Sequence, residues 1–89
     1  MKSQTTEKFR LLLAAATPAR QARIRSAYRI WRDNPAHPSL RFKKVHTRVP
    51  IYSVRVDLDR RAMGILEDGT MVWSWVGPHR EYEAMLKAP

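Results

Sequence analysis

The residues best suited to chemistry are a band of basic side chains in the second half of the chain, followed by an imidazole and a phenol. The basic band consists of Arg41, Lys43, Lys44, Arg48, Arg55, Arg60 and Arg61. The imidazole is that of His79 and the phenol that of Tyr82. Cations can bind phosphate and stabilise a reacting phosphoryl group, and imidazole or phenol groups can transfer protons. These residue types fit the cleavage of RNA by its own 2′-hydroxyl, which needs neither a metal ion nor a protein nucleophile.

Each of these residues also has a simpler explanation. His79 could be a water-exposed residue at the start of a helix, and Tyr82 could be a core aromatic whose hydroxyl reaches the surface. The basic band could line a phosphate-binding cleft, because residues remote in sequence converge on an antiparallel sheet, or it could only solvate the surface. The residue types alone leave both interpretations open.

The charge balance favours a polyanionic partner. Lys and Arg number 17 against 8 Asp and Glu, which gives a formal net charge of +9 and a pI near 10.9. Most of the basic residues are Arg, whose planar guanidinium binds phosphate with two hydrogen bonds and stacks on bases. Nucleic acid is therefore the expected partner, and a purely solubilising charge is the alternative.

Several classes of site are excluded or disfavoured by the sequence. The chain has no Cys, which excludes disulfides and thiolate metal sites and favours a reducing, cytoplasmic location. It has no glycine-rich phosphate loop, no nucleophile elbow and no His pair at metal-binding spacing, so we expect no metal and no cofactor. The apolar run from Leu11 to Ala16 is too short for a signal peptide, and no segment is long enough to span a membrane.

Two amphipathic helices are predicted in the first 34 residues. Thr6 is the expected N-cap of the first, and Thr17-Pro18 starts the second with an N-cap and a proline at the first helical position. The apolar stripe of the first helix is Phe9, Leu12, Leu13 and Ala16, and that of the second is Ile24, Ala27, Tyr28 and Trp31. Arginines cover much of the remaining surface of the second helix, at positions Arg20, Arg23, Arg25, Arg29 and Arg32.

Strands are predicted over about residues 40–46, 51–57, 60–67 and 70–77, with Asp68-Gly69 as a hairpin turn. Alternation in the second strand places Val54 on an apolar face and Arg55 on the opposite one. In the last strand Met71, Trp73 and Trp75 are expected to share one face. The opposite face of that strand is also apolar, which predicts a central position in the sheet. A closing helix is expected after Gly77-Pro78.

The predicted fold is therefore α+β: an N-terminal helical hairpin packed on a curved antiparallel sheet of about four strands, with a short C-terminal helix. Its 89 residues suit one domain over positions 1–89. Residues 1–6 are short and polar, and we expect them to be flexible.

The order of segments resembles the RelE/ParE superfamily of type II toxins. The resemblance rests on a hairpin ending in "RDNPAHPSLRFKKV", then "IYSVRVDLDRRAMGI", an acidic-Gly turn and "MVWSWVGPHREYEAML", and it covers nearly all of residues 7–87. It implies a curved antiparallel sheet against a helical hairpin, and a co-expressed antitoxin as partner. It also implies one of two activities: RelE-like members cut mRNA in the ribosomal A site, whereas ParE members poison DNA gyrase.

The resemblance implies active positions on the second and third strands and at the end of the last strand. Here these match Arg55, Arg61, His79 and Tyr82. The implied roles are phosphate binding and charge stabilisation by the two arginines, proton transfer by His79, and orientation of the 2′-hydroxyl or base by Tyr82. The residues expected to hold RNA backbone are Arg41, Lys43, Lys44, Arg48 and Arg60.

Two departures from the family pattern bear on function. RelE-like chains usually begin with a strand, which residues 1–6 are not expected to supply, and Ser53 stands where a strand lysine is expected. The favoured hypothesis is a ribosome-dependent mRNA endonuclease. A gyrase poison without nuclease activity and a non-toxic basic nucleic-acid-binding module are the alternatives.

Overall fold

Five strands form one mixed sheet in the computed structural model, which describes residues 1–87. The strands are β1 (Lys2–Thr5), β2 (Lys43–Lys44), β3 (Ile51–Arg55), β4 (Arg60–Glu67) and β5 (Thr70–Pro78). Their order across the sheet is β1-β5-β4-β3-β2, and every neighbouring pair is antiparallel except β1 and β5, which are parallel. β5 thus has a partner on both sides, as its two apolar faces predicted.

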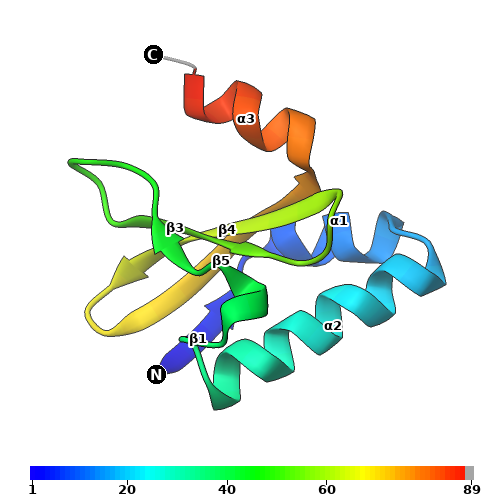
Figure 1. The fold of residues 1–89 in the computed structure, drawn as a ribbon, viewed down its shortest axis with the longest axis horizontal. Coiled ribbons are helices and arrows are strands. Elements are labelled where there is room, and N and C mark those ends of the chain that lie inside the picture. Colours follow the sequence, from blue (N-terminus) through cyan, green and yellow to red (C-terminus); the bar gives the residue numbers. More distant parts are fainter. Residues whose placement is uncertain (88–89) are drawn as a thin grey trace.

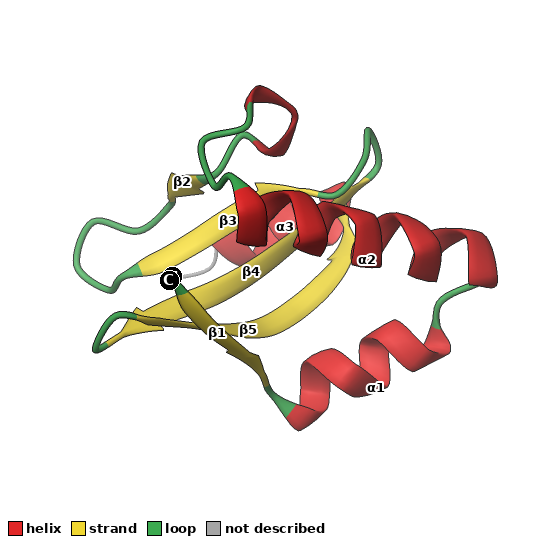
Figure 2. Cartoon of the chain, turned by 90° about the horizontal axis from the view of Figure 1, so that it is seen from below, coloured by secondary structure: helices red, strands yellow, loops and turns green. Residues whose placement is uncertain are grey.

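The helices lie on both sides of this sheet. They are α1 (Glu7–Ala15), α2 (Pro18–Asp33), the 3-10 helix η1 (Pro38–Leu40) and α3 (His79–Lys87). Figures 1 and 2 show α1 and α2 on one side of the sheet and α3 on the other. Both predicted N-caps are present, since the hydroxyl oxygen of Thr6 accepts from the Phe9 N–H at 3.1 Å and that of Thr17 from the Arg20 N–H at 3.3 Å. The α+β class, the helical hairpin and the closing helix are confirmed.

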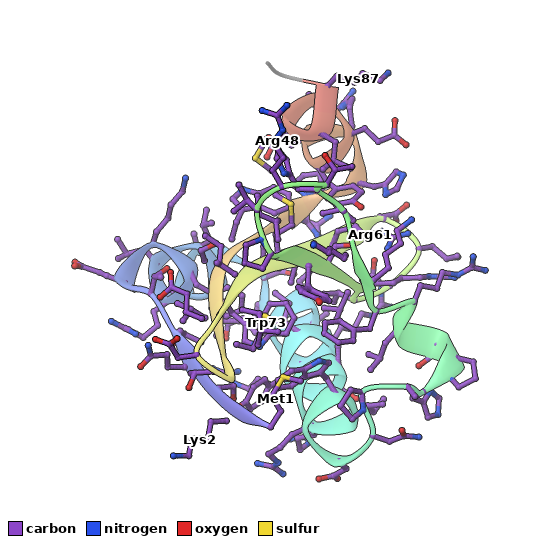
Figure 3. The ribbon with its side chains drawn as sticks, turned by 90° about the vertical axis from the view of Figure 1, so that its left-hand side faces the viewer. Met1, Lys2, Arg48, Arg61, Trp73 and Lys87 are labelled. Atoms are coloured by element: carbon purple, nitrogen blue, oxygen red, sulfur yellow. The ribbon has the colours of Figure 1, made fainter. Side chains whose placement is uncertain are left out.

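The core lies between the sheet and the α1–α2 hairpin. At its centre the rings of Trp31 and Trp73 meet edge to face, with centroids 5.2 Å apart. Met71 of β5 and Leu40 of η1 are buried in the same cluster. Figure 3 shows Trp73 on the side of the sheet that faces α2. This packing fixes β4 and β5, so the opposite side of the same strands is held rigidly as well.

The prediction that residues 1–6 are flexible and supply no strand was wrong. Lys2–Thr5 form β1, which runs parallel to β5 and pairs Lys2 with Thr70 through to Thr5 with Trp73. The Thr6 N–H also donates to the carbonyl oxygen of Trp73 at 2.9 Å. This polar segment forms a strand because β5 supplies hydrogen-bond partners for its backbone. Backbone pairing of this kind requires no alternation of apolar side chains, so nothing in the sequence indicated the strand.

The strand predicted over residues 40–46 is mostly absent. Pro38–Leu40 form η1, and only Lys43–Lys44 pair with β3. Pro38 starts η1 at its first position, and Leu40 is buried in the core from the end of that turn. The sheet thus has five strands of mixed direction rather than about four antiparallel ones.

The expected common face of Met71, Trp73 and Trp75 is interrupted by a β-bulge. Met63 pairs with Trp75, but its neighbour Gly64 pairs with Trp73, so Ser74 has no opposite residue. The core cluster consequently contains Val76 and not Trp75. The absence of a side chain at Gly64 permits β4 and β5 to lie close together at the bulge, because a Cβ on Gly64 would be only 2.7 Å from the carbonyl oxygen of Val72.

Tyr28 is the one predicted stripe residue of α2 that lies at the surface, with 37% of its area exposed. Its ring stacks beside Trp31 and its hydroxyl lies 2.6 Å from the Ser3 Oγ of β1.

The predicted Asp68-Gly69 hairpin turn is confirmed, with positive φ at both residues. No helix formed by residues 1–87 has the length and apolar character needed to cross a membrane.

Candidate functional site

Arg55 and Arg61 form the centre of the candidate site. They are directly opposite each other on β3 and β4. The neighbouring pair, Val54 and Ala62, is buried in the core under the helical hairpin, so alternation directs both arginines to the α3 side of the sheet. Figure 3 shows Arg61 on that side. Like charges directly opposite on neighbouring strands destabilise a sheet, so this pair concentrates positive charge at a cost in stability.

An open pocket of about 230 Å³ lies at this end of the sheet. It is lined by Arg41, Arg55, Asp57, Leu58, Arg61 and His79. These residues come from the end of η1, from β3 and the turn after it, from β4 and from the start of α3. The pocket therefore combines three guanidinium groups and one imidazole with a single carboxylate, that of Asp57, a set with an excess of positive charge that can bind a phosphate and transfer a proton beside it.

Arg41 reaches the pocket from a strained backbone position. It ends η1 with a φ of 45° and a ψ of 44°, in the left-handed region that residues with a Cβ rarely occupy. Such conformations cost on the order of 1–3 kcal/mol and cluster at functional sites. The strain is consistent with a need to direct this side chain toward Arg55 and Arg61.

Tyr82 is buried beneath the pocket rather than exposed in it. The residue is 4% exposed, and its hydroxyl lies 3.2 Å from the Oγ of Ser53, which is fully buried. The Arg61 guanidinium lies over its ring at 5.3 Å, and the His79 ring is 5.6 Å away. Tyr82 is thus in position to hold Arg61 and His79 in place.

The two central arginines are not neutralised by acidic side chains. Neither Arg55 nor Arg61 forms an ion pair within residues 1–87. Nη1 of Arg61 is buried and has no hydrogen-bond partner in that range. Since Arg61 is held by packing on an aromatic ring, its charge remains free to attract an anion into the pocket.

His79 is the first residue of α3 and is anchored at its backbone. Its N–H donates to the carbonyl oxygen of Asp59 at 2.7 Å, which ties α3 to the turn between β3 and β4. Its ring is 40% exposed, and Nε2 lies 2.6 Å from the Glu83 Oε1 one turn along the helix. The imidazole therefore has access both to solvent and to the pocket.

Asp57 is a pocket residue that the sequence interpretation missed as a site residue. One carboxylate oxygen accepts the Asp59 N–H at 2.8 Å, and the other lies 3.5 Å from the Arg23 Nη1 of α2. These contacts hold the β3–β4 turn, where Leu58 is 81% exposed at the pocket. The Asp-Leu-Asp spacing is a signal for such a side-chain-capped turn.

The remaining members of the basic band lie outside this pocket. Lys43, Lys44 and Arg48 are exposed on β2 and the loop after it. Arg60 precedes Arg61 and lines a different hollow, with Arg20 of α2 and Glu81. The structure thus brings together Arg41, Arg55, Arg61 and His79, with Tyr82 behind them, and the band as a whole does not form one cleft. Within residues 1–87, no group of three or more His, Asp or Glu side chains is arranged to hold a metal ion.

Comparison with solved structures places this geometry in a known fold. The chain is similar to YafQ from E. coli strain BL21(DE3), with a TM-score of 0.72 and 10% identity over 91% of this chain and 96% of that one. It is similar to a chain of the RelB–RelE antitoxin–toxin complex from Methanococcus jannaschii, with a TM-score of 0.70 and 13% identity over 91% and 95% of the two chains. For the archaeal RelE–RelB complex from Pyrococcus horikoshii OT3, the TM-score is 0.68 and the identity 15%, over 86% and 92%.

The chain has the RelE-like fold. Neither a protein-family model nor a curated protein matches its sequence. At identities of 10–15% the likeness is carried by the fold, because few side chains are shared. The fold nevertheless spans 86–91% of this chain and 92–96% of the other chain in the three comparisons.

Proposed function

We propose that this protein is the toxin of a type II toxin–antitoxin pair and that it cuts messenger RNA on the ribosome, in the cytoplasm. The observation that carries the proposal is the meeting of Arg41, Arg55, Arg61 and His79 in one pocket of a RelE-like fold. Two of the solved structures with this fold contain an antitoxin beside the toxin, which supports a cognate antitoxin as partner.

In the proposed reaction, the 2′-hydroxyl oxygen of one nucleotide attacks the adjacent phosphorus. A bond forms between that oxygen and phosphorus, and the bond from phosphorus to the 5′-oxygen of the next nucleotide breaks. The products are a 2′,3′-cyclic phosphate and a free 5′-hydroxyl. One proton must leave the 2′-oxygen and one must reach the 5′-oxygen, so the reaction needs proton-transfer groups but no protein nucleophile.

The pocket residues divide these tasks. Arg55 and Arg61, with Arg41 beside them, bind the phosphate and stabilise the extra negative charge of the pentacoordinate transition state. His79 transfers a proton as general acid or base. Tyr82 supports Arg61 and His79 from beneath the pocket. We propose this role in place of orienting the 2′-hydroxyl or base of the RNA, because the Tyr82 hydroxyl is already hydrogen-bonded to that of Ser53. Lys43, Lys44 and Arg48 would contact RNA backbone outside the pocket.

The decisive experiment is induced expression in bacteria, with mapping of RNA 5′ ends and an in vitro translation assay. We expect growth arrest and cleaved mRNA from the wild type. His79→Ala and Arg61→Ala should each lower the cleavage rate by roughly 10² to 10³, as loss of an acid–base or charge-stabilising group does. Because the proposed reaction uses the RNA's own nucleophile, the cut ends should carry a 2′,3′-cyclic phosphate and a 5′-hydroxyl, whereas attack by water would leave a linear phosphate.

Two matched variants control for charge and residue type. Arg60→Ala removes an arginine adjacent to Arg61 that lines a different hollow, and His46→Ala removes an exposed imidazole outside the pocket. Both should retain cleavage near the wild-type rate, and all variants are checked by thermal melting. Intact mRNA with accumulated cleaved DNA would replace the nuclease proposal with a gyrase poison. Abundant harmless expression of the wild type would contradict a toxin.

A further inference from the structure

A second hollow, larger than the pocket, lies between α2, η1 and the β3–β4 turn. Its volume is about 500 Å³, within the roughly 300–1,000 Å³ typical of sites that bind small organic molecules. We call it the α2–η1 hollow. It shares Arg55, Asp57 and Leu58 with the pocket, so the two spaces adjoin each other.

The floor of the α2–η1 hollow is apolar. Ala27 of α2 and Leu40 of η1 are buried members of the core, and Ile30 and Val56 are half-buried against the same core. Leu58 adds an exposed apolar side chain. An apolar surface that opens to solvent favours a ligand with an apolar face, and every nucleobase has such a face.

The charged residues of the α2–η1 hollow favour an anionic ligand. Its lining includes two arginines, Arg23 and Arg55, against the single carboxylate of Asp57. The Arg23 side chain is 66% exposed, and its Nη1 lies 3.5 Å from the Asp57 Oδ2. Exposed ion pairs of this kind are weak, so the guanidinium remains available to stack on a base.

The two spaces meet at an edge of the sheet. β2 pairs only with Tyr52 and Ser53 of β3, so Arg55 has a strand neighbour on the β4 side alone. From this edge Arg55 lines both the pocket and the α2–η1 hollow. A nucleotide carries a phosphate and a base on one sugar, which matches a cationic pocket beside an apolar hollow.

Resting on the function proposed above, we propose that the α2–η1 hollow binds one base of the RNA, that of a nucleotide whose phosphate lies at Arg55. An apolar side chain of a partner protein is the other class of occupant. The positive excess and the continuity with the pocket favour the nucleotide, because its base and phosphate are covalently linked.

The first test compares ligands with and without a base, by NMR titration of the isolated protein. The probes are adenosine 5′-monophosphate, adenosine 3′-monophosphate and ribose 5-phosphate. At least one of the two nucleotides should bind about tenfold or more tightly than ribose 5-phosphate, as expected for one stacked base. The nucleotide should shift the methyl signals of Ile30 and Leu40, which line the α2–η1 hollow, more than those of Ile65, which lines a different hollow. Equal affinities for all three probes would overturn the inference.

The second test fills the α2–η1 hollow with a side chain. Ser26→Trp and Ser39→Trp each place an indole at a residue that lines it. They should lower the affinity for the nucleotide to that for ribose 5-phosphate, and leave the affinity for ribose 5-phosphate unchanged. Ala36→Trp is the matched control, because it adds the same ring at an exposed position that does not line this hollow.

Thermal melting checks that each tryptophan variant folds. Loss of the base-dependent affinity in either folded Ser→Trp variant supports the base subsite. Wild-type nucleotide affinity in both folded variants would overturn it. These binding measurements require no cleavage. If the wild type binds the nucleotide through the α2–η1 hollow but cuts no RNA, the proposed function fails and the subsite stands. If it cuts RNA but does not distinguish the nucleotides from ribose 5-phosphate, the subsite fails alone.

Discussion

The two sides of the sheet are built from the same strands but hold their side chains by different means. On the helical side, Trp31 and Trp73 are 1% and 3% exposed and are held by packing against α1, α2 and each other. On the α3 side, Arg55 and Arg61 are opposite each other without an acidic partner in residues 1–87. Apolar packing stabilises the first side, while the second side retains a repulsion that folding alone would not favour.

The difference shows where the stability of this fold and its chemistry reside. Single-residue alternation along β3 and β4 places Val54 and Ala62 in the core and Arg55 and Arg61 in the pocket. The packed side therefore sets the positions of the charged side, since neighbouring residues share one backbone. Changes on the helical side should cost stability, and changes in the pocket should cost activity at little cost in stability.

The largest expected effect is on the helical side. Trp31→Ala should lower the free energy of unfolding by about 3–5 kcal/mol, as truncation of a buried aromatic does. Nε1 of Trp31 has no hydrogen-bond partner within residues 1–87, so this loss comes from packing alone. Denaturant unfolding followed by tryptophan fluorescence measures it. A loss below about 1 kcal/mol would show that the α2–sheet contact contributes little, and would remove the basis of the comparison.

The elements that follow a local pattern were predictable from the sequence. The Thr cap of each helix, the apolar stripes apart from Tyr28, the alternation around Val54 and the Asp68-Gly69 turn appear where they were expected. Each depends on interactions between residues close in sequence. The prediction that Met71, Trp73 and Trp75 share one face of β5 was wrong. Ser74 has no opposite residue on β4, so Trp75 and Val76 each lie on the face expected for the other, and the position of such a bulge depends on the partner strand.

The site was predictable in residue type but not in membership. The sequence named Arg41, Arg55, Arg61 and His79, which line the pocket, but it did not separate them from the other members of the basic band, and it missed Asp57. Which basic residues converge depends on the route from η1 to β2 and on the start of α3, and neither has a sequence period. β1 was missed for the same reason, since its partner β5 lies some seventy residues away in the chain.

An intermediate effect is expected where the pocket meets the interior. Tyr82→Phe leaves the Ser53 hydroxyl buried without its partner and should lower the free energy of unfolding by about 1 kcal/mol, within the 1–3 kcal/mol range for such groups. The ring remains, so Arg61 and His79 keep their support and cleavage should change less than in His79→Ala. The double variant Ser53→Ala with Tyr82→Phe should lose less than the sum of the single losses. Strict additivity would show that the two hydroxyls do not interact.

The smallest change in stability is expected at Arg55, and it is the most informative for the charged side. Arg55→Gln relieves the repulsion with Arg61 and should alter the free energy of unfolding by no more than about 0.5 kcal/mol. It should weaken binding of single-stranded RNA and reduce the slope of log affinity against log salt by about 0.7, the value for one phosphate contact. The matched control is Arg29→Gln on the exposed surface of α2, which removes the same charge from a residue that does not line the pocket. If RNA binds through the pocket, only Arg55→Gln reduces the slope. An equal reduction in both variants would mean that RNA senses the net charge of +9 as a whole, and the separation between a packed side and a phosphate-binding side would not hold for binding.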